Sequence, residues 1–199
     1  MKIMAFSDLH LSEERAADLV TASKEADLVI GAGDFCNMRQ GLARAMGLLT
    51  GIAAPVVMVP GNAESAEELR GCALSSTIVL HGSGTEVAGL QLFGLGGGIP
   101  ETPFGDWSFD LSEREAARRL SEAREVDILI THSPPKGAGD TTSAGLSIGS
   151  QSIRAAIERL QPQVAVFGHV HDCWGYRGQI GASACANLGP TPNWFEVSR

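Results

Sequence analysis

Metal-capable side chains follow five short apolar runs of this chain, each within a few residues of the end of the run. The first run, Ile3–Phe6, leads into Asp8-Leu9-His10, and the second, Leu28–Ile30, leads into Gly33-Asp34. The other runs and the motifs after them are Val56–Val59 before Gly61-Asn62, Ile128–Ile130 before Thr131-His132, and Val164–Phe167 before Gly168-His169-Val170-His171. In open α/β sheets, ligands bind beyond the carboxyl ends of the strands. Five strand ends that offer Asp, Asn or His therefore predict one convergent site.

The histidines of the chain gather at these motifs. Of the five histidines, four lie in the motifs, and the fifth, His81, follows the strand-like segment Thr77–Leu80. Mixed oxygen and nitrogen donors suit Mn, Fe, Ni or Zn, whereas Ca or Mg sites built from oxygen would not need four histidines. A bridging carboxylate could hold two ions about 3.5–4 Å apart, as two-metal hydrolysis requires. We predict a site for two divalent ions, manganese first among them, with the ligands Asp8, His10, Asp34, Asn62, His132, His169 and His171.

Each motif taken alone has an ordinary structural interpretation. An isolated Asp-x-His or Gly-Asp at a strand end is usually a turn or a helix cap, and Gly61-Asn62 alone indicates a turn. Gly168-His169-Val170-His171 alone is compatible with a site for one metal ion or with a buried polar pair. The conjunction of all five, in order and at successive strand ends, favours the metal site.

The segments that must position these residues alternate between strand and helix. The five apolar runs have the continuous pattern of strands buried on both faces. Helical spacing places Ala16, Leu19, Val20 and Ser23 on one face, Met38, Leu42, Ala45, Met46 and Leu49 on another, and Ile153, Ala156, Ile157 and Leu160 on a third. Ser65 with Glu68, and Ser112 with Glu115, fit the capping box of a helix start. Strand-like pieces fill Thr77–Phe93 and the segment from Cys173 to the end, so we predict one α/β domain over residues 1–199.

Composition narrows the classes of function. The 199 residues are 44% hydrophobic, which suffices for one sizeable core, and no apolar run reaches the ~20 residues of a membrane span. A net charge of −8 without a basic run argues against a nucleic acid as a stable partner. The start of the chain lacks the apolar stretch of a signal peptide, and the four cysteines form no Cys-x-x-Cys pair. We expect a soluble cytoplasmic protein whose cysteines are reduced and buried, and we make no prediction of its oligomeric state.

Two long segments between the motifs, 95–110 and 133–149, are rich in Gly, Pro, Ser and Thr. Loops of this length in a compact domain are usually either functional or disordered, and composition does not separate the two. Trp107 and Phe109 in the first segment are candidates for stacking on a base, although aromatic side chains more often anchor a loop. Lys136 and Arg177 are candidates for contact with phosphate, although isolated basic residues are more often solvated.

The five motifs resemble the five conserved blocks of the calcineurin-like metallophosphoesterases. The match runs from residue 8 to residue 171, Thr131-His132-Ser133-Pro134-Pro135 resembles the fourth block of some small members, and Asn187-Leu188-Gly189-Pro190 resembles a turn that often follows. The resemblance implies a four-layer α/β/β/α sandwich. It also implies that Asp8, His10, Asp34 and His171 hold one ion, and that Asp34, Asn62, His132 and His169 hold the other, with Asp34 as the bridge.

One position departs from the family pattern. Many members carry a histidine directly after the asparagine of the third block, where this chain has Ala63 before Glu64. That histidine is usually credited with protonating the leaving group or contacting the phosphate, and the loss of a general acid typically costs about 10²–10⁴-fold in rate. Diesters with good leaving groups need such an acid least. What replaces it is open; His81 is a candidate, although a structural role for it is favoured.

These observations predict a phosphodiesterase that acts on a small phosphodiester, with nucleotide diesters among the candidates. The expected reaction is in-line displacement at phosphorus by a hydroxide that bridges the two ions, with Asp8, Asp34, Asn62 and His132 as the catalytic residues. The ions would also neutralise charge on the phosphoryl oxygens, so that a chain of net charge −8 could accept an anionic substrate. Two alternatives stay open: a phosphomonoesterase or protein phosphatase, and a metal-binding interaction module without turnover.

Overall fold

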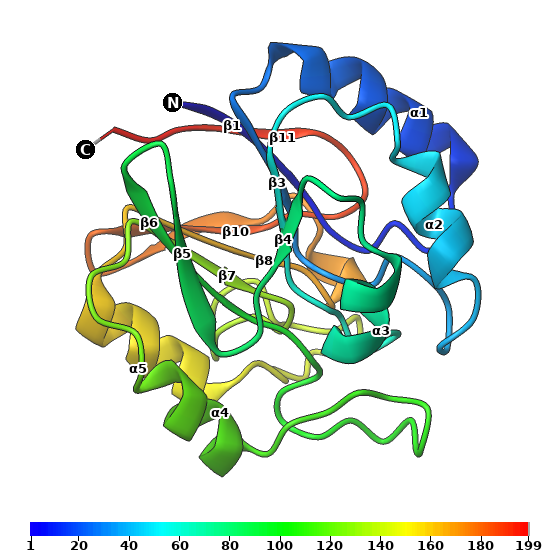
Figure 1. Ribbon diagram of the computed structural model, residues 1–199. Helices are drawn as coiled ribbons and strands as arrows, with labels where there is room; N and C mark the ends of the chain where they lie inside the picture. The colour runs from blue at the N-terminus through cyan, green and yellow to red at the C-terminus, as the bar shows by residue number, and fades with distance from the viewer. Residues whose placement is uncertain (199) are drawn as a thin grey trace.

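The computed structural model describes residues 1–198 and consists of two β-sheets that pack face to face, with helices on the outer face of each (Figure 1). The first sheet has the strand order β11-β1-β2-β3-β4, and the second has the order β5-β6-β7-β8-β10-β9. The strands of the first sheet are β1 (Lys2–Phe6), β2 (Leu28–Gly31), β3 (Val56–Met58), β4 (Thr77–Val79) and β11 (Asn193–Glu196). Those of the second are β5 (Ser83–Val87), β6 (Leu90–Leu95), β7 (Ile128–Thr131), β8 (Val164–Phe167), β9 (Arg177–Ile180) and β10 (Ser183–Asn187). All five predicted strands are present.

The direction of the strands brings the predicted motifs to one edge. Strands β1 to β4 pair in parallel, and so do β6, β7, β8 and β10, whereas β11, β5 and β9 pair antiparallel to their neighbours. The helices are α1 (Glu13–Ala22), α2 (Leu42–Leu48), α3 (Ala66–Cys72), α4 (Glu113–Leu120) and α5 (Gln151–Leu160), with short 3₁₀ turns at Ser23–Glu25 and His171–Cys173. Figure 1 shows α1, α2 and α3 beside the first sheet and α4 and α5 beside the second.

Three buried clusters hold these layers together and follow from the period of two along each strand. In β1, Ile3 and Ala5 face the second sheet, while Met4 and Phe6 pack with α1 and α2. The outer face of the second sheet packs against α4 and α5 through residues such as Leu129 and Ile157. The resulting order of layers confirms the predicted four-layer α/β/β/α sandwich.

Serine side chains begin four of the five α-helices, in agreement with the sequence signals. The predicted capping box at Ser65 and Glu68 is complete, because each side chain bonds the backbone of the other. The second predicted box is only half present. The Ser112 hydroxyl accepts from the backbone of Glu115, but the Glu115 carboxylate pairs with Arg118 and Arg119 instead of returning to the cap.

Two further predictions are wrong in part. Met38 does not lie on the helix with Leu42 and Ala45: α2 begins at Leu42, and Met38 sits in a turn with a φ of 46° and is 56% exposed. All four cysteines are free, but Cys72 and Cys173 are half-buried rather than buried. Neither thiol lies on the inner face of a strand, where the continuous apolar pattern secures burial.

Among the described residues, no helix has the length and apolar character needed to cross a bilayer.

A candidate metal centre between the two sheets

The structure brings all seven predicted ligands together beyond the carboxyl ends of five strands from both sheets. Six of them form two groups whose donor atoms lie within 4.8 Å of one another: Asp8, His10 and His171 in the first group, and Asp34, His132 and His169 in the second. Asp8 and His10 follow β1, Asp34 follows β2, His132 directly follows β7 and the last two histidines follow β8. The grouping agrees with the two ligand sets that the family resemblance implies. Their role as ligands stays a prediction.

Asp34 connects the two groups. Its Oδ2 lies 3.6 Å from His10 Nε2, and its Oδ1 lies 3.3 Å from His132 Nε2, so each carboxylate oxygen faces a different group. Asn62, which follows β3, adds the seventh donor, because its Oδ1 lies 3.2 Å from His132 Nε2. This is the arrangement that a bridging carboxylate requires.

Backbone carbonyls orient the imidazole rings. His10 Nδ1 lies 3.1 Å from Cys36 O and 2.8 Å from Asn37 Oδ1, and His132 Nδ1 lies 2.8 Å from Ala32 O. A ring nitrogen that faces a backbone carbonyl is held away from the site, so Nε2 is the atom of each ring that faces the other metal-capable residues. His10 Nε2 and His171 Nε2 are 3.3 Å apart. Two imidazole nitrogens at this distance need a proton or a cation between them, so the donor set fits a divalent ion.

The long segment 95–110 contacts Asn62 and orients it. The Asn62 amide donates from Nδ2 to Ser108 Oγ at 3.1 Å, and its backbone carbonyl accepts from Phe109 N at 2.9 Å. Ser108 in turn donates to Asp110 Oδ1 at 2.8 Å. Because Nδ2 is held on the loop side, Oδ1 is the atom that faces His132 and the metal-capable groups.

Four of the seven residues have left-handed backbone conformations, namely Asp8 (φ 54°), His10 (φ 44°), Asp34 (φ 57°) and His169 (φ 68°). Such conformations are strained for residues other than glycine, and they concentrate at functional sites. Glycine is also required where the backbone passes close to the carboxylates. A Cβ atom on Gly61 would lie 1.9 Å from Asp34 Oδ1, and one on Gly168 would lie 2.4 Å from Asp8 Oδ2.

The two buried carboxylates draw positive charge into the site. Burial alone would raise the pKa of Asp34, but the adjacent His132 and His10 hold the pKa below its usual range. Burial alone would lower the pKa of His132, but Asp34 raises this pKa to about 9. Burial and the charge on His132 lower the pKa of His169 to about 4. Asp8 and Asp34 are 1% and 5% exposed, and they attract cations in a setting where water screens little.

Several residues that support the site were not singled out in the sequence. Trp174 donates from Nε1 to Asp8 Oδ2 at 3.1 Å, and its ring lies 4.4 Å from that of His171. Ser7 donates to Asp8 Oδ2 at 2.5 Å and is itself held by Gly189, whose N donates to Ser7 Oγ at 3.0 Å. The position of a Trp or Ser beside a motif is not by itself a signal for this contact, because the pairing depends on the three-dimensional fold.

Glu64 holds the loops that carry Asp34 and Asn62. Its buried carboxylate accepts from the backbone N–H groups of Asp34 at 2.8 Å, Phe35 at 3.1 Å and Gly61 at 2.7 Å. Burial, together with the charge of Asp34, raises the pKa of Glu64 to about 7. This residue acts through the backbone of the two motifs and positions them against each other.

Two other candidates from the sequence, Arg177 and His81, do not join the donor groups. Arg177 donates to backbone carbonyls of Tyr176 and Asn187 and to the Asn193 side chain, so it supports the C-terminal segment. His81 packs against Phe109 with ring centroids 5.2 Å apart, and burial lowers its pKa to about 4. Both observations give His81 a structural role.

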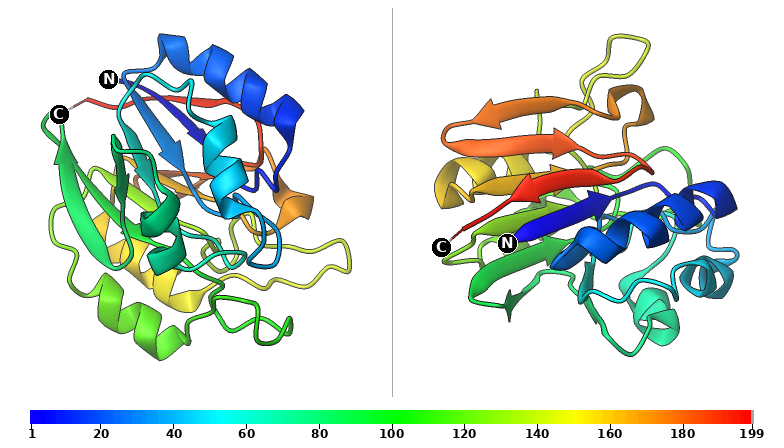
Figure 2. Two further views of the ribbon diagram at one scale, coloured as in Figure 1. Left: turned by 45° about the vertical axis from the view of Figure 1, so that its right-hand side comes forward. Right: turned by 90° about the horizontal axis from the view of Figure 1, so that it is seen from above.

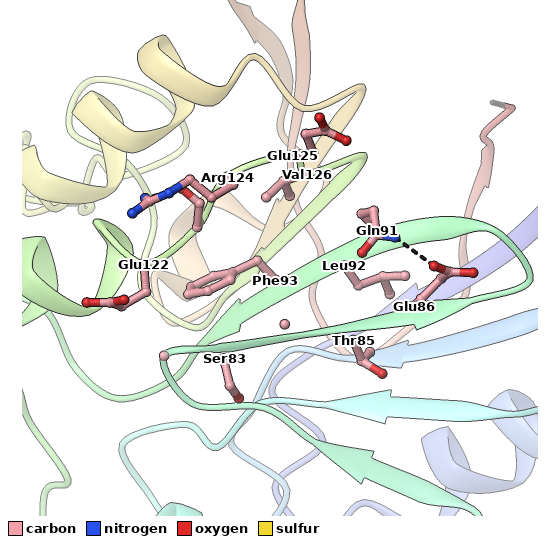
Figure 3. A pocket seen from close by; sticks show the side chains of 13 residues that line it. Ser83, Thr85, Glu86, Gln91, Leu92, Phe93, Glu122, Arg124, Glu125 and Val126 are labelled. Atoms are coloured by element: carbon pink, nitrogen blue, oxygen red, sulfur yellow. Dashed lines mark hydrogen bonds between the residues drawn. The ribbon is translucent and has the colours of Figure 1, made fainter.

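Of the cavities in the structure, one borders the donor set and another lies away from it. One of about 490 Å³ is lined by the long segments 95–110 and 133–149, and His169 forms part of its wall. The other, of about 340 Å³, lies between the β5–β6 hairpin and the segment after α4, and Figure 3 shows Glu86 and Gln91 bonded at its rim. None of the seven residues lines this second cavity.

Comparison with known proteins agrees with this geometry. The family model described as calcineurin-like phosphoesterase matches residues 1–173. The human protein named metallophosphoesterase domain-containing protein 1 is 31% identical over 136 residues, which are 63% of this chain and 39% of that protein. The chain spans 26% to 39% of the length of the curated relatives it matches.

Solved structures share the fold at low sequence identity. The protein TT1561 of Thermus thermophilus superposes with a TM-score of 0.74 at 16% identity, covering 98% of this chain and 97% of that one. A dimetal phosphatase from Danio rerio superposes with a TM-score of 0.63 at 13% identity, covering 96% of this chain and 88% of that one. With a family model that covers most of the residues, the chain belongs to the calcineurin-like phosphoesterase family, as its five motifs predicted.

Proposed function

We propose that this protein is a phosphoesterase that uses two divalent metal ions and that favours small phosphodiesters. The observation that carries the proposal is the convergence of seven oxygen and nitrogen donors, six of which form two groups that Asp34 connects. Ions held by these groups would supply charge neutralisation for a phosphoryl group and activation of a water molecule. Manganese is our first choice of metal, since mixed imidazole and carboxylate donors suit it, with Fe, Ni and Zn as the alternatives.

The residues of the chain contribute orientation rather than proton transfer. His10 and His132 are held with their Nε2 atoms toward the site, and Asn62 is held with its carbonyl oxygen toward it. Asp8 is fixed by three donors, which are Ser7 Oγ, Trp174 Nε1 and His169 N. Donors that are already oriented lose little freedom when they bind a ligand.

The preference for a diester rests on Ala63. This residue is 2% exposed, packs in the buried cluster between the first sheet and its helices, and offers only its backbone N–H, which donates to Asp34 Oδ1 at 2.8 Å. It therefore has no acidic proton for a leaving group. His81 packs against Phe109 and belongs to neither donor group, so we do not assign it as the missing acid. Substrates whose leaving group departs without a proton fit such a site best.

We further propose that the partner of the protein is a small phosphorylated molecule in the cytoplasm. The net charge of −8 disfavours a stable complex with a nucleic acid. Four free cysteines without a Cys-x-x-Cys pair suit a reducing compartment.

The test is hydrolysis of bis-p-nitrophenyl phosphate beside p-nitrophenyl phosphate, with manganese and with a chelator. We expect chelator-sensitive turnover that favours the diester, and its loss together with metal binding in Asp34→Asn. A preference for p-nitrophenyl phosphate would support a phosphomonoesterase instead. Folded, metal-loaded protein that turns over neither compound would support the metal-binding interaction module, which Ala63 favours. An Asp34→Asn variant with full activity would refute the site.

A further inference from the structure

The cavity of about 490 Å³ beside the metal-capable groups has a wall that is mainly apolar. It lies between the two long segments 95–110 and 133–149, which project from the same side of the molecule (Figure 2, left). Its apolar wall is formed by Ile99, Pro100, Pro103, Phe104 and Ile148. We name this feature the loop groove. His169 also lines it, so the groove opens directly beside the second group of donors.

The exposed apolar side chains of the loop groove are held in place. Phe104 is 50% exposed, and its ring stacks on Trp107 with centroids 5.5 Å apart and planes 11° apart. Ile148 is 41% exposed, and its backbone N donates to Asp140 O at 3.0 Å. Asp140 also accepts from Gly149 N at 2.9 Å, which fixes the turn next to Ile148. Apolar side chains kept at the surface beside a reactive site are suited to contact with a ligand.

Most polar side chains of the groove already bond within the protein. Thr102 Oγ1 donates to Asp110 Oδ2 at 2.8 Å, and Lys136 Nζ donates to Ser147 O at 2.5 Å. The Glu113 carboxylate accepts from Gln151 N at 2.8 Å and from Ser152 N at 2.9 Å at the start of α5. A polyhydroxylated ligand would find few free partners here, and an unpaired polar group in a groove lowers affinity.

The charged side chains of the loop groove further restrict the ligands that it can bind. The lining residues include the carboxylates of Glu101 and Glu113 against the single ammonium group of Lys136. A second phosphate or carboxylate on the ligand would meet repulsion in the groove. The favoured occupant is therefore uncharged as well as apolar.

We propose that the loop groove binds an apolar, uncharged ester substituent of the substrate, such as an aryl or branched alkyl group, while the phosphoryl group lies at the seven donors. This inference rests on the proposed function and assigns its substrate class: a singly charged phosphodiester with one bulky apolar arm. Phe104 and Ile148 are its specificity-determining residues.

The test uses two diesters with the same leaving group and charge, phenyl p-nitrophenyl phosphate and methyl p-nitrophenyl phosphate. The variants are Ile148→Ala, Phe104→Ala and both together, with Ile78→Ala as the matched control. Ile78 is 38% exposed, lies on β4 and does not line the groove. We expect the double variant to lower the phenyl-to-methyl ratio of kcat/KM by about 10-fold, mainly through the KM of the phenyl ester, and Ile78→Ala to leave this ratio unchanged. An unchanged ratio, or an equal fall in Ile78→Ala, would overturn the proposal.

A binding experiment separates failure of the groove from failure of the proposed function. Calorimetry of manganese-loaded protein would compare diphenyl phosphate with dimethyl phosphate. We expect tighter binding of diphenyl phosphate to the wild type and loss of this advantage in the double variant. If no diester is hydrolysed but this pattern holds, the proposed catalysis fails and the groove stands. If the wild type binds both compounds equally, the groove assignment is wrong, whether or not turnover occurs.

Discussion

Asn187→Ala is expected to weaken the metal centre from outside it. Asn187 ends β10, is fully buried, and donates from Nδ2 to the carbonyls of Gly139 at 2.9 Å, Gly168 at 3.2 Å and Val170 at 3.2 Å. The last two carbonyls flank His169. The side chain thereby fixes the backbone that carries one proposed ligand without touching the ligand itself.

The expected loss of stability depends on which hydrogen-bond donors each of the three carbonyls keeps in Asn187→Ala. After truncation, Gly168 O still accepts from Val170 N at 2.8 Å, and Val170 O still accepts from Cys173 N at 3.0 Å. The carbonyl of Gly139 loses the amide donor, and a buried polar group left unpaired costs about 1–3 kcal/mol. With the two weakened bonds and a small cavity, we expect the free energy of unfolding to fall by about 2–4 kcal/mol. For a chain of this size, that corresponds to a fall in Tm of roughly 4–16 °C.

Metal affinity supplies the decisive measurement. Loss of a residue that orients a ligand typically weakens metal binding by about 10–100-fold. The assay is urea unfolding of chelated protein together with manganese titration by calorimetry. The control is Arg159→Ala, which removes side-chain bonds to Ala123 O at 3.2 Å and Leu120 O at 2.8 Å between α5 and α4. Arg159→Ala should lower the free energy of unfolding and leave the manganese affinity unchanged. The reasoning is refuted if Asn187→Ala keeps wild-type affinity, or if Arg159→Ala loses as much.

Gly61→Ala, with its control Gly71→Ala, and Trp174→Phe test the support of the site, and His81→Gln tests the burial of a ring outside it. Gly61→Ala should displace Asp34, because the new Cβ would lie 1.9 Å from Asp34 Oδ1, and calorimetry should then detect no manganese binding. The control is Gly71→Ala in α3, where the added Cβ meets open space. This variant should raise the free energy of unfolding, measured in urea, by about 0.5–1 kcal/mol. Trp174→Phe keeps a ring beside His171 but loses the N–H group that donates to Asp8, so manganese affinity should fall by about 3–10-fold. An unchanged Kd for manganese would show that this donor is dispensable. His81 titrates near 4 when folded and near 6.5 when unfolded, so the unfolded chain binds the extra proton between these values and stability falls as pH drops from 6.5 to 4. Between pH 8 and pH 5, the free energy of unfolding measured in urea should therefore fall by about 1 kcal/mol less in His81→Gln than in the wild type. An equal fall in the two proteins would contradict the burial of the ring.

The strands and the convergence of the seven residues at their ends were predictable from sequence for one physical reason. A strand buried on both faces must be apolar throughout, so Ile3–Phe6 and Val164–Phe167 stand out from their surroundings. Parallel strands end at the same edge, so the polar residues that follow them meet in space whatever the strand order. The strand order was not predictable from these runs, because β1 pairs with β11, which lies at the opposite end of the sequence.

The residues that support the site were hidden because their contacts are long-range. Trp174 and Asp8 are 166 positions apart, and His132 bonds a carbonyl 100 positions away at Ala32. The errors at the level of helices have a local cause. Met38 has the spacing of a helical face, but the turn before α2 places Gly41 as its N-cap with a φ of 85°, which ends any continuation toward Met38. Periodicity does not reveal where a helix begins without a capping residue.

The strain at the site explains why the seven proposed ligands lie between two sheets. Four of them hold left-handed backbone conformations, which cost about 1–3 kcal/mol each. Such conformations persist only where surrounding contacts determine them. Here the contacts come from both sheets: Asp8 N and His10 N donate to carbonyls of the β2 loop at 2.9 Å and 3.1 Å, and Gly168 N donates to His132 O at 2.9 Å. A single sheet with helices could supply only one half of this support. The apolar interface between the sheets therefore contributes to function as well as to stability, because it keeps two strained sets of donors in register across the shared Asp34.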